Sequence, residues 1–258
     1  MNTLYSHSHT NLADEGNNMS VKGIVNEALK QIHEGTELEI SQLLFNLTYS
    51  SLLEAVNKGL EGEIKQEFKS KLKYSAASFS AHKTAAQCAE LRDSLLDENG
   101  KKRSFAKFKK AVSGIVDNYN VRWLEVEHQA AVRGARMATN WQRWEAQADI
   151  YPNLRYLQTR ATTPDEAHLK LVGIVRPMND PFWRKHLPPS RWGCLCGAVP
   201  TTEGVTELPE KLPEVSQGLG GNVGQTGELF TDDHPYFSKK VSEQTINSLQ
   251  DAYKPSAE

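Results

Sequence analysis

The chain has 258 residues, which is enough for one or two domains with a sizeable core. Its formal net charge of -2 gives no overall bias toward nucleic acid or acidic membranes. No apolar run approaches the roughly 20 residues that cross a bilayer, so no membrane span is expected, and the polar N-terminus is unlike a secretory signal. Three cysteines, an odd number, argue against a disulfide framework and fit a reducing compartment.

The first 150 residues predict a helical arm that follows a disordered N-terminus. Residues 1–20 are polar and rich in turn-forming residues, which is typical of disorder. Between residues 21 and 150, apolar side chains recur every three or four positions, as they do in helices that bury one stripe. The longest pattern runs from Phe105 to Trp144. It fits either one helix of about 40 residues or two helices broken near residues 118–120.

Residues 151–205 predict a small α+β domain with a short antiparallel sheet. Residues 154–159 alternate apolar and polar side chains, which indicates a strand. Thr163 followed by Pro164 is a typical start of a short helix. The prolines between residues 176 and 191 predict an irregular loop. Residues 169–175 are expected to form either a buried strand or a transition from helix to strand, and residues 194–199 a closing strand.

The remaining residues, 206–258, predict a flexible tail that ends in a helix. Residues 217–227 are rich in glycine, which is typical of a flexible linker. Their glycines miss the Gly-x-Gly-x-x-Gly spacing of nucleotide-binding loops by one residue. Apolar residues recur on one side of residues 239–253, which predicts the last helix. The predicted fold class is therefore α+β, with a long N-terminal helical region, a small α+β domain and a flexible C-terminal tail.

Two cysteines and two histidines of the predicted α+β domain are candidate metal ligands. On a strand, Cys194 and Cys196 would point to the same face, so both thiolates could reach one ion. His168 and His186 are the available nitrogen donors, and Asp165 could orient the His168 imidazole from one helical turn away. Together they would form a Cys-Cys-His-His or Cys-Cys-His-water zinc site. The alternative is a pair of small apolar side chains beside a hydrogen-bonded core histidine, with no cofactor.

An enzyme is the first alternative class of protein. The candidates are a nuclease-like or metal-dependent effector centred on His168. In a hydrolytic enzyme, His168 would act as the base, Asp165 would orient it, and a cysteine or threonine would be the nucleophile. A nuclease would use His168 with Arg160. The sequence contains no recognisable nucleophile elbow or oxyanion loop. Single Asp and His residues on a short helix are more often capping or packing groups, which favours a protein that is not an enzyme.

A DNA-binding accessory protein is the second alternative. A basic cluster lies at the start of the longest helical pattern, although a helix dipole favours acidic residues there. Such clusters are usually solvated faces, and contact with phosphates is the rival interpretation. The candidate DNA contacts are Lys101, Lys102, Arg103, Lys107, Lys109 and Lys110.

Aromatic residues and prolines gather between residues 182 and 192, where they can brace a small domain that has little core. With neighbouring residues they form a series of motifs in the order Tyr156-Leu-Gln-Thr, Asp165-x-x-His168, Leu171-x-Gly173-x-Val175, Asp180-Pro-Phe-Trp183, Pro188-Pro189 and Trp192-x-Cys194-x-Cys196. This order resembles the phage Mu F-like head morphogenesis family, minor capsid proteins of tailed phages and prophages. The resemblance covers about residues 150–200, and it departs from the family at Leu195, where arginine is common.

The resemblance implies a non-enzymatic minor head protein that associates with the portal vertex during capsid assembly and DNA packaging or ejection. The implied partners are the portal protein and capsid or scaffold subunits, with phage DNA as a further partner. The implied location is the cytoplasm of a bacterial host during assembly and then the head interior of the virion. The positions carried over as a structural signature are Asp165, Gly173, Asp180, Trp183, Pro189 and Trp192.

Overall fold

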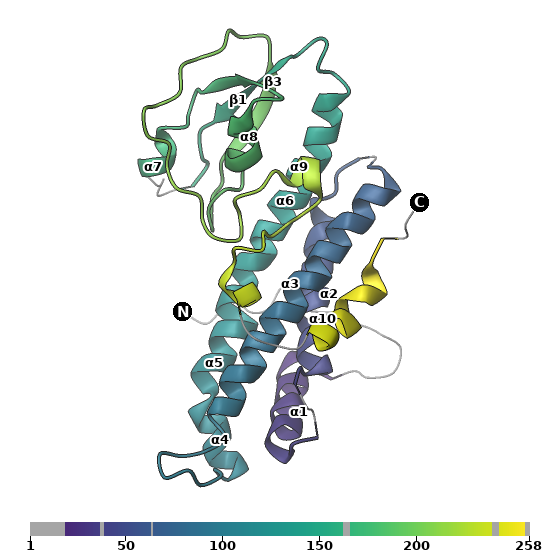
Figure 1. Ribbon diagram of the computed structural model, residues 1–258, viewed down its shortest axis with the longest axis vertical. Coiled ribbons are helices and arrows are strands. Elements are labelled where there is room, and N and C mark those ends of the chain that lie inside the picture. Colours follow the sequence, from purple (N-terminus) through teal and green to yellow (C-terminus); the bar gives the residue numbers. More distant parts are fainter. Residues whose placement is uncertain (1–18, 37–38, 63, 162–165, 239–242, 256–258) are drawn as a thin grey trace.

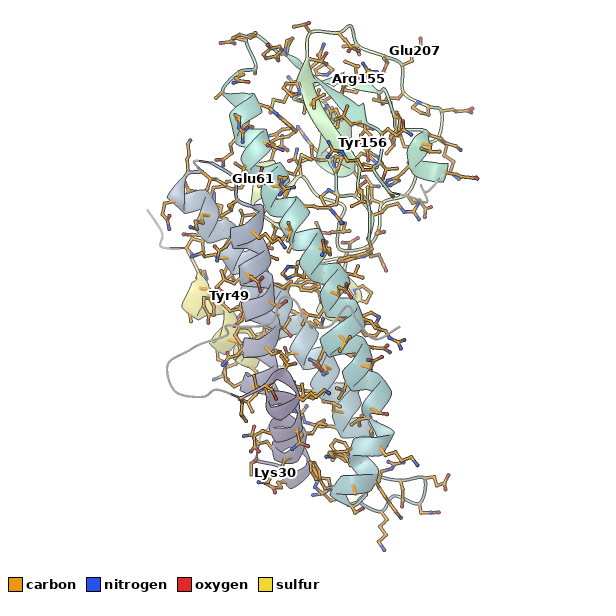
Figure 2. The ribbon with its side chains drawn as sticks, turned by 180° about the vertical axis from the view of Figure 1, so that it is seen from behind. Lys30, Tyr49, Glu61, Arg155, Tyr156 and Glu207 are labelled. Atoms are coloured by element: carbon orange, nitrogen blue, oxygen red, sulfur yellow. The ribbon has the colours of Figure 1, made fainter. Side chains whose placement is uncertain are left out.

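The computed structural model describes residues 19–36, 39–62, 64–161, 166–238 and 243–255. They form an elongated bundle of helices with a small three-stranded domain at one end, which confirms the predicted α+β fold class (Figure 1). Seen from behind, Lys30 lies near one end of the rod, and Arg155 and Glu207 lie at the other (Figure 2). The predicted disorder before residue 19 and the predicted helix start at Thr163 fall outside the described residues.

The helical arm is built mainly from four long helices. Serine side chains cap the first two: the Ser20 hydroxyl accepts a hydrogen bond from the Gly23 amide at 3.3 Å, and the Ser41 hydroxyl accepts one from the Leu44 amide at 3.4 Å. These bonds satisfy amide groups that have no partner within the helix. The four helices are α1 (Val21–Glu34), α2 (Gln42–Gly59), α3 (Gln66–Asp93) and α6 (Trp123–Glu145).

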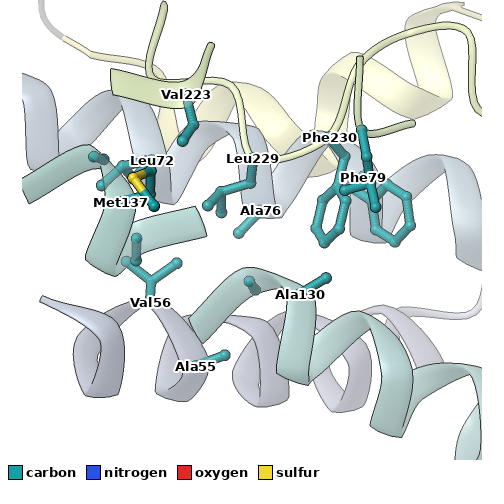
Figure 3. Close-up of a cluster of buried hydrophobic side chains, with 14 of the residues drawn as sticks. Ala55, Val56, Leu72, Ala76, Phe79, Ala130, Met137, Val223, Leu229 and Phe230 are labelled. Carbon is teal, nitrogen blue, oxygen red and sulfur yellow. The ribbon is translucent and has the colours of Figure 1, made fainter. Parts of the chain in front are cut away.

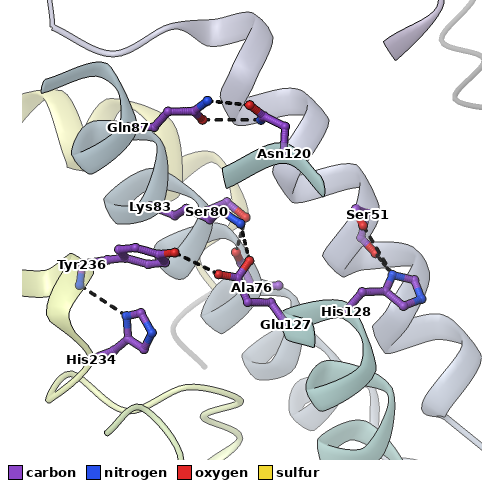
Figure 4. A network of polar contacts seen from close by, with 10 residues as sticks. All are labelled: Ser51, Ala76, Ser80, Lys83, Gln87, Asn120, Glu127, His128, His234 and Tyr236. Carbon is purple, nitrogen blue, oxygen red and sulfur yellow. Dashed lines mark hydrogen bonds and ion pairs between the residues drawn. The ribbon is translucent and has the colours of Figure 1, made fainter. Parts of the chain in front are cut away.

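The long pattern from Phe105 to Trp144 is interrupted where the sequence predicted a break. The chain passes through α4 (Phe105–Ala111), α5 (Ser113–Asp117) and a π-helical turn, η1 (Asn118–Arg122), before α6 begins. Asn120 lies in this wider turn and is buried against Gln87 of α3. The two amides exchange hydrogen bonds of 2.5 and 3.4 Å, so the turn places a polar pair inside the arm (Figure 4).

The core of the arm lies between α2, α3 and α6 and contains many small residues. Figure 3 shows Ala55, Ala76 and Ala130 in this core, beside larger side chains such as Phe79. Small side chains let helices approach closely. A Cβ atom added at Gly59 would lie 2.2 Å from the Val132 carbonyl oxygen, so glycine is required where α2 meets α6.

The domain at the end of the arm contains a sheet in the order β2-β1-β3, with both pairs of strands antiparallel. Its strands are β1 (Asn153–Leu157), β2 (Val175–Pro177) and β3 (Gly197–Thr201). On β1, Leu154 and Tyr156 are buried and their neighbours are more exposed, as the alternating sequence predicted. The first predicted strand is thus confirmed, whereas β2 and β3 begin later than predicted.

The segment predicted as an irregular loop, residues 176–191, contains a short helix, α8 (Pro181–His186), and this prediction was wrong. The Asp180 carboxylate accepts a hydrogen bond from the Phe182 amide at 2.8 Å and caps the helix. Pro181 occupies the first helical turn, where its missing N–H has no cost. Pro181 therefore favours the start of this helix instead of preventing a helix in the segment.

The glycine-rich residues 217–227 pack along the arm, which corrects the expectation of a flexible linker there. They include the short helix α9 (Val223–Thr226), and both Leu219 and Val223 are buried in the main core. A Cβ atom at Gly224 would lie 2.2 Å from Cβ of Trp141, so glycine serves close packing. The later elements are η2 (Pro235–Ser238), α10 (Glu243–Gln250) and η3 (Asp251–Tyr253), which confirm a terminal helix within the described residues. None of the helices in the described part of the chain is long and apolar enough to cross a bilayer.

Candidate metal centre

His168, Cys194 and Cys196 meet in the small domain. Their ligand atoms all lie within 4.8 Å of one another. The His168 Nδ1 atom is 3.4 Å from the Cys194 sulfur and 3.6 Å from the Cys196 sulfur. His168 is buried, and both cysteines are partly buried and free of disulfides. The sequence correctly singled out these three residues as neighbours.

The cysteines come together through a turn, which corrects the prediction that they share a strand. Strand β3 begins after them, at Gly197. Gly193 has a φ of +75°, and the Cys194 amide donates to the Arg191 carbonyl at 3.1 Å, so the chain reverses just before the first thiol. The Cys196 amide then donates to the Cys194 sulfur at 3.3 Å. The histidine comes from α7 (Glu166–Leu169), in the connection between β1 and β2.

The pKa values of the Cys194 and Cys196 thiols are shifted in opposite directions. A hydrogen bond from Cys194 lowers the pKa of Cys196 from about 9 to about 5, and His168 and Tyr156 add to this effect. The same bond and burial raise the pKa of Cys194, so Cys194 keeps its proton. Burial also raises the pKa of Tyr156. The site therefore offers a ready thiolate next to an imidazole, which suits either metal binding or nucleophilic chemistry.

His186 lies outside the group of three, so the structure brings together three of the four predicted ligands. Its ring stacks on Phe182 with centroids 5.1 Å apart. Its pKa is lowered by burial and by the charges of Lys185 and His168, which places it near the group. The buried His186 Nδ1 atom has no hydrogen-bond partner among the described residues. Asp165, the predicted orienting residue, lies outside the described part of the chain.

Two signature residues hold the small domain together. The Asp180 carboxylate accepts a hydrogen bond from Arg176 Nη2 at 2.6 Å in addition to capping α8. Trp183 is fully buried, donates to the Arg176 carbonyl at 3.2 Å and stacks parallel to Tyr156 with centroids 6.3 Å apart. Both residues therefore act in packing.

The other described signature residues shape the chain or join its parts. Gly173 has a φ of +84°, which L side chains rarely adopt, in the turn before β2. Pro189 follows a cis peptide bond. Trp192 donates to the Gln217 carbonyl at 3.2 Å and stacks on Phe230 with centroids 5.8 Å apart, so it joins the small domain to the C-terminal segment.

The candidate DNA-contact residues lie at the opposite end of the rod, around the loop between α3 and α4 (Figure 1). Arg103 is used locally, because it donates to the carbonyls of Ser94 and Leu96. Lys109 donates to the Asn26 side chain at 3.0 Å and lies over the Phe105 ring. The exposed members are Lys101, Lys102, Lys107, Lys109 and Lys110.

Two curated proteins match part of the chain. Over 92 residues it is 28% identical to capsid assembly protein F of Escherichia phage Mu, and the match covers 32% of this chain and 20% of that protein. Over 99 residues it is 24% identical to the Mu-like prophage FluMu F protein of Haemophilus influenzae, covering 33% of this chain and 24% of that protein. The chain is a distant relative of the Mu F proteins. No family model and no solved structure matches it.

The matched regions make up less than a quarter of the length of either F protein. The likeness is confined to these regions, and the activities of the whole F proteins do not transfer to this chain with it. The name of the phage Mu protein describes capsid assembly.

Sequence reasoning missed a buried polar network in the arm. Lys83 of α3 and Glu127 of α6 form an ion pair with almost no exposed surface, and the Tyr236 hydroxyl donates to Glu127 at 3.1 Å (Figure 4). A signal was present: Lys83 lies four residues after Phe79 and three before Ala86, on the buried stripe of its helix. A lysine at such a position needs a buried partner.

Proposed function

We propose that this chain is a structural head protein of a phage or prophage and associates with the portal vertex during capsid assembly. The match to two Mu F proteins, one of them named for capsid assembly, carries the proposal. The portal protein and capsid or scaffold subunits are the proposed partners. The proposed location is the cytoplasm of a bacterial host during assembly and the phage head afterwards.

The architecture supports a role in holding parts together. The arm is a long, tightly packed bundle, and the small domain is fixed to it by the C-terminal segment through Trp192 and Phe230. A rod of this kind can span between two neighbouring components of an assembly.

The acidic thiolate of Cys196 beside His168 is the observation that favours an enzyme. Two hollows in the described surface are lined by other residues, such as Glu61 with Arg143 and Pro189 with Gly218. A structural role therefore explains the described site better than turnover of a substrate.

The test is assembly of heads from the genome that encodes this chain, with and without its gene. We expect the protein to co-purify with the portal protein and with purified heads, and heads made without it to be fewer or to package less DNA. Two control proteins separate the alternatives. His168→Asn tests the enzyme, and replacement of Lys107, Lys109 and Lys110 by Gln tests DNA binding.

The lysine variant should still enter heads, and the His168→Asn protein should not differ from the wild type in turnover of nucleic acid. Heads that lack the wild-type protein, together with a portal protein that does not retain it, would rule out the proposal. Loss of incorporation in the lysine variant alone would favour the DNA-binding alternative, and His168-dependent turnover of nucleic acid would favour the enzyme.

A further inference from the structure

The geometry of His168, Cys194 and Cys196 is that of one face of a tetrahedral zinc site. With Zn–S near 2.3 Å and Zn–N near 2.0–2.1 Å, a tetrahedral angle places sulfur and nitrogen ligands about 3.6 Å apart. The two sulfur–nitrogen separations in the structure are 3.4 and 3.6 Å. Both nitrogen–sulfur pairs therefore already have the separation that a single ion requires, and all three ligand atoms lie within 4.8 Å of one another.

Hydrogen bonding alone does not explain this arrangement. A neutral imidazole nitrogen either carries one proton or offers one lone pair, so Nδ1 of His168 can pair well with only one of the two sulfurs. Both sulfurs nevertheless lie at similar distances from that atom. An ion at the centre would interact with all three atoms at once.

We propose that His168, Cys194 and Cys196 bind one zinc ion. Two cysteine sulfurs, of which Cys194 would release its proton on binding the ion, and an imidazole are soft and intermediate donors. Such donors suit zinc and disfavour magnesium or calcium. A water molecule or the nearby, buried His186 Nδ1 atom would be the fourth ligand of the tetrahedron. This inference goes beyond the proposed function and does not depend on it.

The position of the site assigns the ion a structural role. His168 lies in the connection from β1 to β2, whereas both cysteines lie in the connection from α8 to β3. The ion would tie these two connections together above a sheet whose strands have only three to five residues. Small domains with little core commonly need such a cross-link. Arg133 of α6 lies close enough to Cys194 for their charges to interact, so the site also borders the arm.

The test is metal binding by the full-length, reduced protein. After chelation and reconstitution, we expect one zinc per chain by elemental analysis. With Co²⁺ in its place, we expect the intense visible bands of a tetrahedral site and a thiolate-to-metal charge-transfer band. Zinc should also raise the melting temperature of the wild-type protein.

Variants define the ligands. Cys194→Ser, Cys196→Ser and His168→Asn should each weaken zinc binding more than about 100-fold, because the loss of even an outer partner of a ligand costs 10- to 100-fold. Cys88→Ala is the matched control, since this thiol is buried in a separate core cluster of the arm, and it should bind zinc like the wild type.

Wild-type reduced protein that takes up neither Zn²⁺ nor Co²⁺ overturns the proposal. So does a Co²⁺ spectrum without a thiolate band, or zinc binding that survives in both cysteine variants. These wild-type measurements decide the question even where a ligand variant fails to fold.

Discussion

Lys83 and Glu127 form a buried ion pair that joins α3 to α6, and the Tyr236 hydroxyl of the C-terminal segment donates to the same carboxylate. Burial lowers the pKa of Lys83 and raises that of Glu127, while the charge of each partner opposes the effect on the other. The pair is therefore stable in its charged form only as long as both partners are present. Three segments that are distant in sequence depend on it.

The first prediction concerns the loss of one partner. Lys83→Met should lower the free energy of unfolding by about 3–5 kcal/mol, because it leaves a buried carboxylate without its counter-ion. The double variant Lys83→Met, Glu127→Leu should recover much of this loss, since no buried charge remains, although Tyr236 loses its acceptor. Urea unfolding of the three proteins measures both effects. A double variant that is as unstable as the sum of the single variants would contradict this account.

The second prediction uses two glycines of the arm. Gly59→Ala should destabilise the protein by about 1–3 kcal/mol, because the new methyl group would meet the Val132 carbonyl where α2 and α6 touch. Gly114→Ala is the matched control: nothing lies within 4 Å of its added methyl group, so helix propensity should make this variant more stable by about 0.5–1 kcal/mol. Thermal and urea unfolding give both values. Equal effects of the two substitutions would show that α2 and α6 are less closely packed than described.

The third prediction concerns the loss of folding stability at acidic pH. Burial and the charge of Lys83 lower the pKa of His234 from 6.5 to about 4, against the attraction of Asp233. Below pH 6.5 the unfolded chain gains a proton at this residue that the folded protein does not take up until about pH 4. The contribution of neutral His234 to the free energy of unfolding is therefore fully present above pH 6.5, and it is lost as the pH falls toward 4.

Because His234 is partly exposed, the loss should be about 1–2 kcal/mol after allowing for solvent screening. His82, which packs on Phe237 nearby, also has a lowered pKa through burial and should add to the loss. Urea unfolding between neutral and acid pH measures the slope, and His234→Gln should make it shallower. An unchanged slope in that variant would show that other groups cause the acid sensitivity.

The fourth prediction separates the DNA-binding alternative from the head-protein proposal. If the exposed lysines at the tip of the arm contact phosphates, DNA affinity should fall steeply between about 50 and 200 mM salt. Replacing Lys107, Lys109 and Lys110 by Gln should then reduce the slope of log affinity against log salt by about one per lysine. Fluorescence anisotropy with a duplex measures this slope. The head-protein proposal expects weak binding that these substitutions barely change.

The sequence predicted the parts of the fold that depend on local pattern. Apolar residues spaced three or four positions apart predicted the helices of the arm. The break predicted near residues 118–120 coincides with the π-helical turn, in which Asn120 contacts Gln87. Alternation identified β1. The three clustered donors of the candidate site were also predicted, because cysteine and histidine are uncommon and stand out in a short segment.

The rest depends on contacts between distant residues, which local pattern does not record. Residues 217–227 have the composition of a linker, yet Gly224 lacks a side chain because Trp141 occupies that space. The cysteines were placed on a strand, whereas the turn at Gly193 brings them together. The sequence pattern also did not reveal the buried partner of Lys83, because Glu127 lies 44 residues away and Tyr236, which donates to Glu127, lies farther still.

The stacking of Phe79 on Phe230, with ring centroids 4.0 Å apart, has a consequence for the order of synthesis. Helix α3 leaves the ribosome long before residue 230 does, so the earlier helices remain uncovered until residues 219–237 have been made. A nascent chain, or one that ends before these residues, would expose Phe79 and Trp141 to solvent and would be prone to aggregate. The interior of the arm closes only after translation has passed this segment.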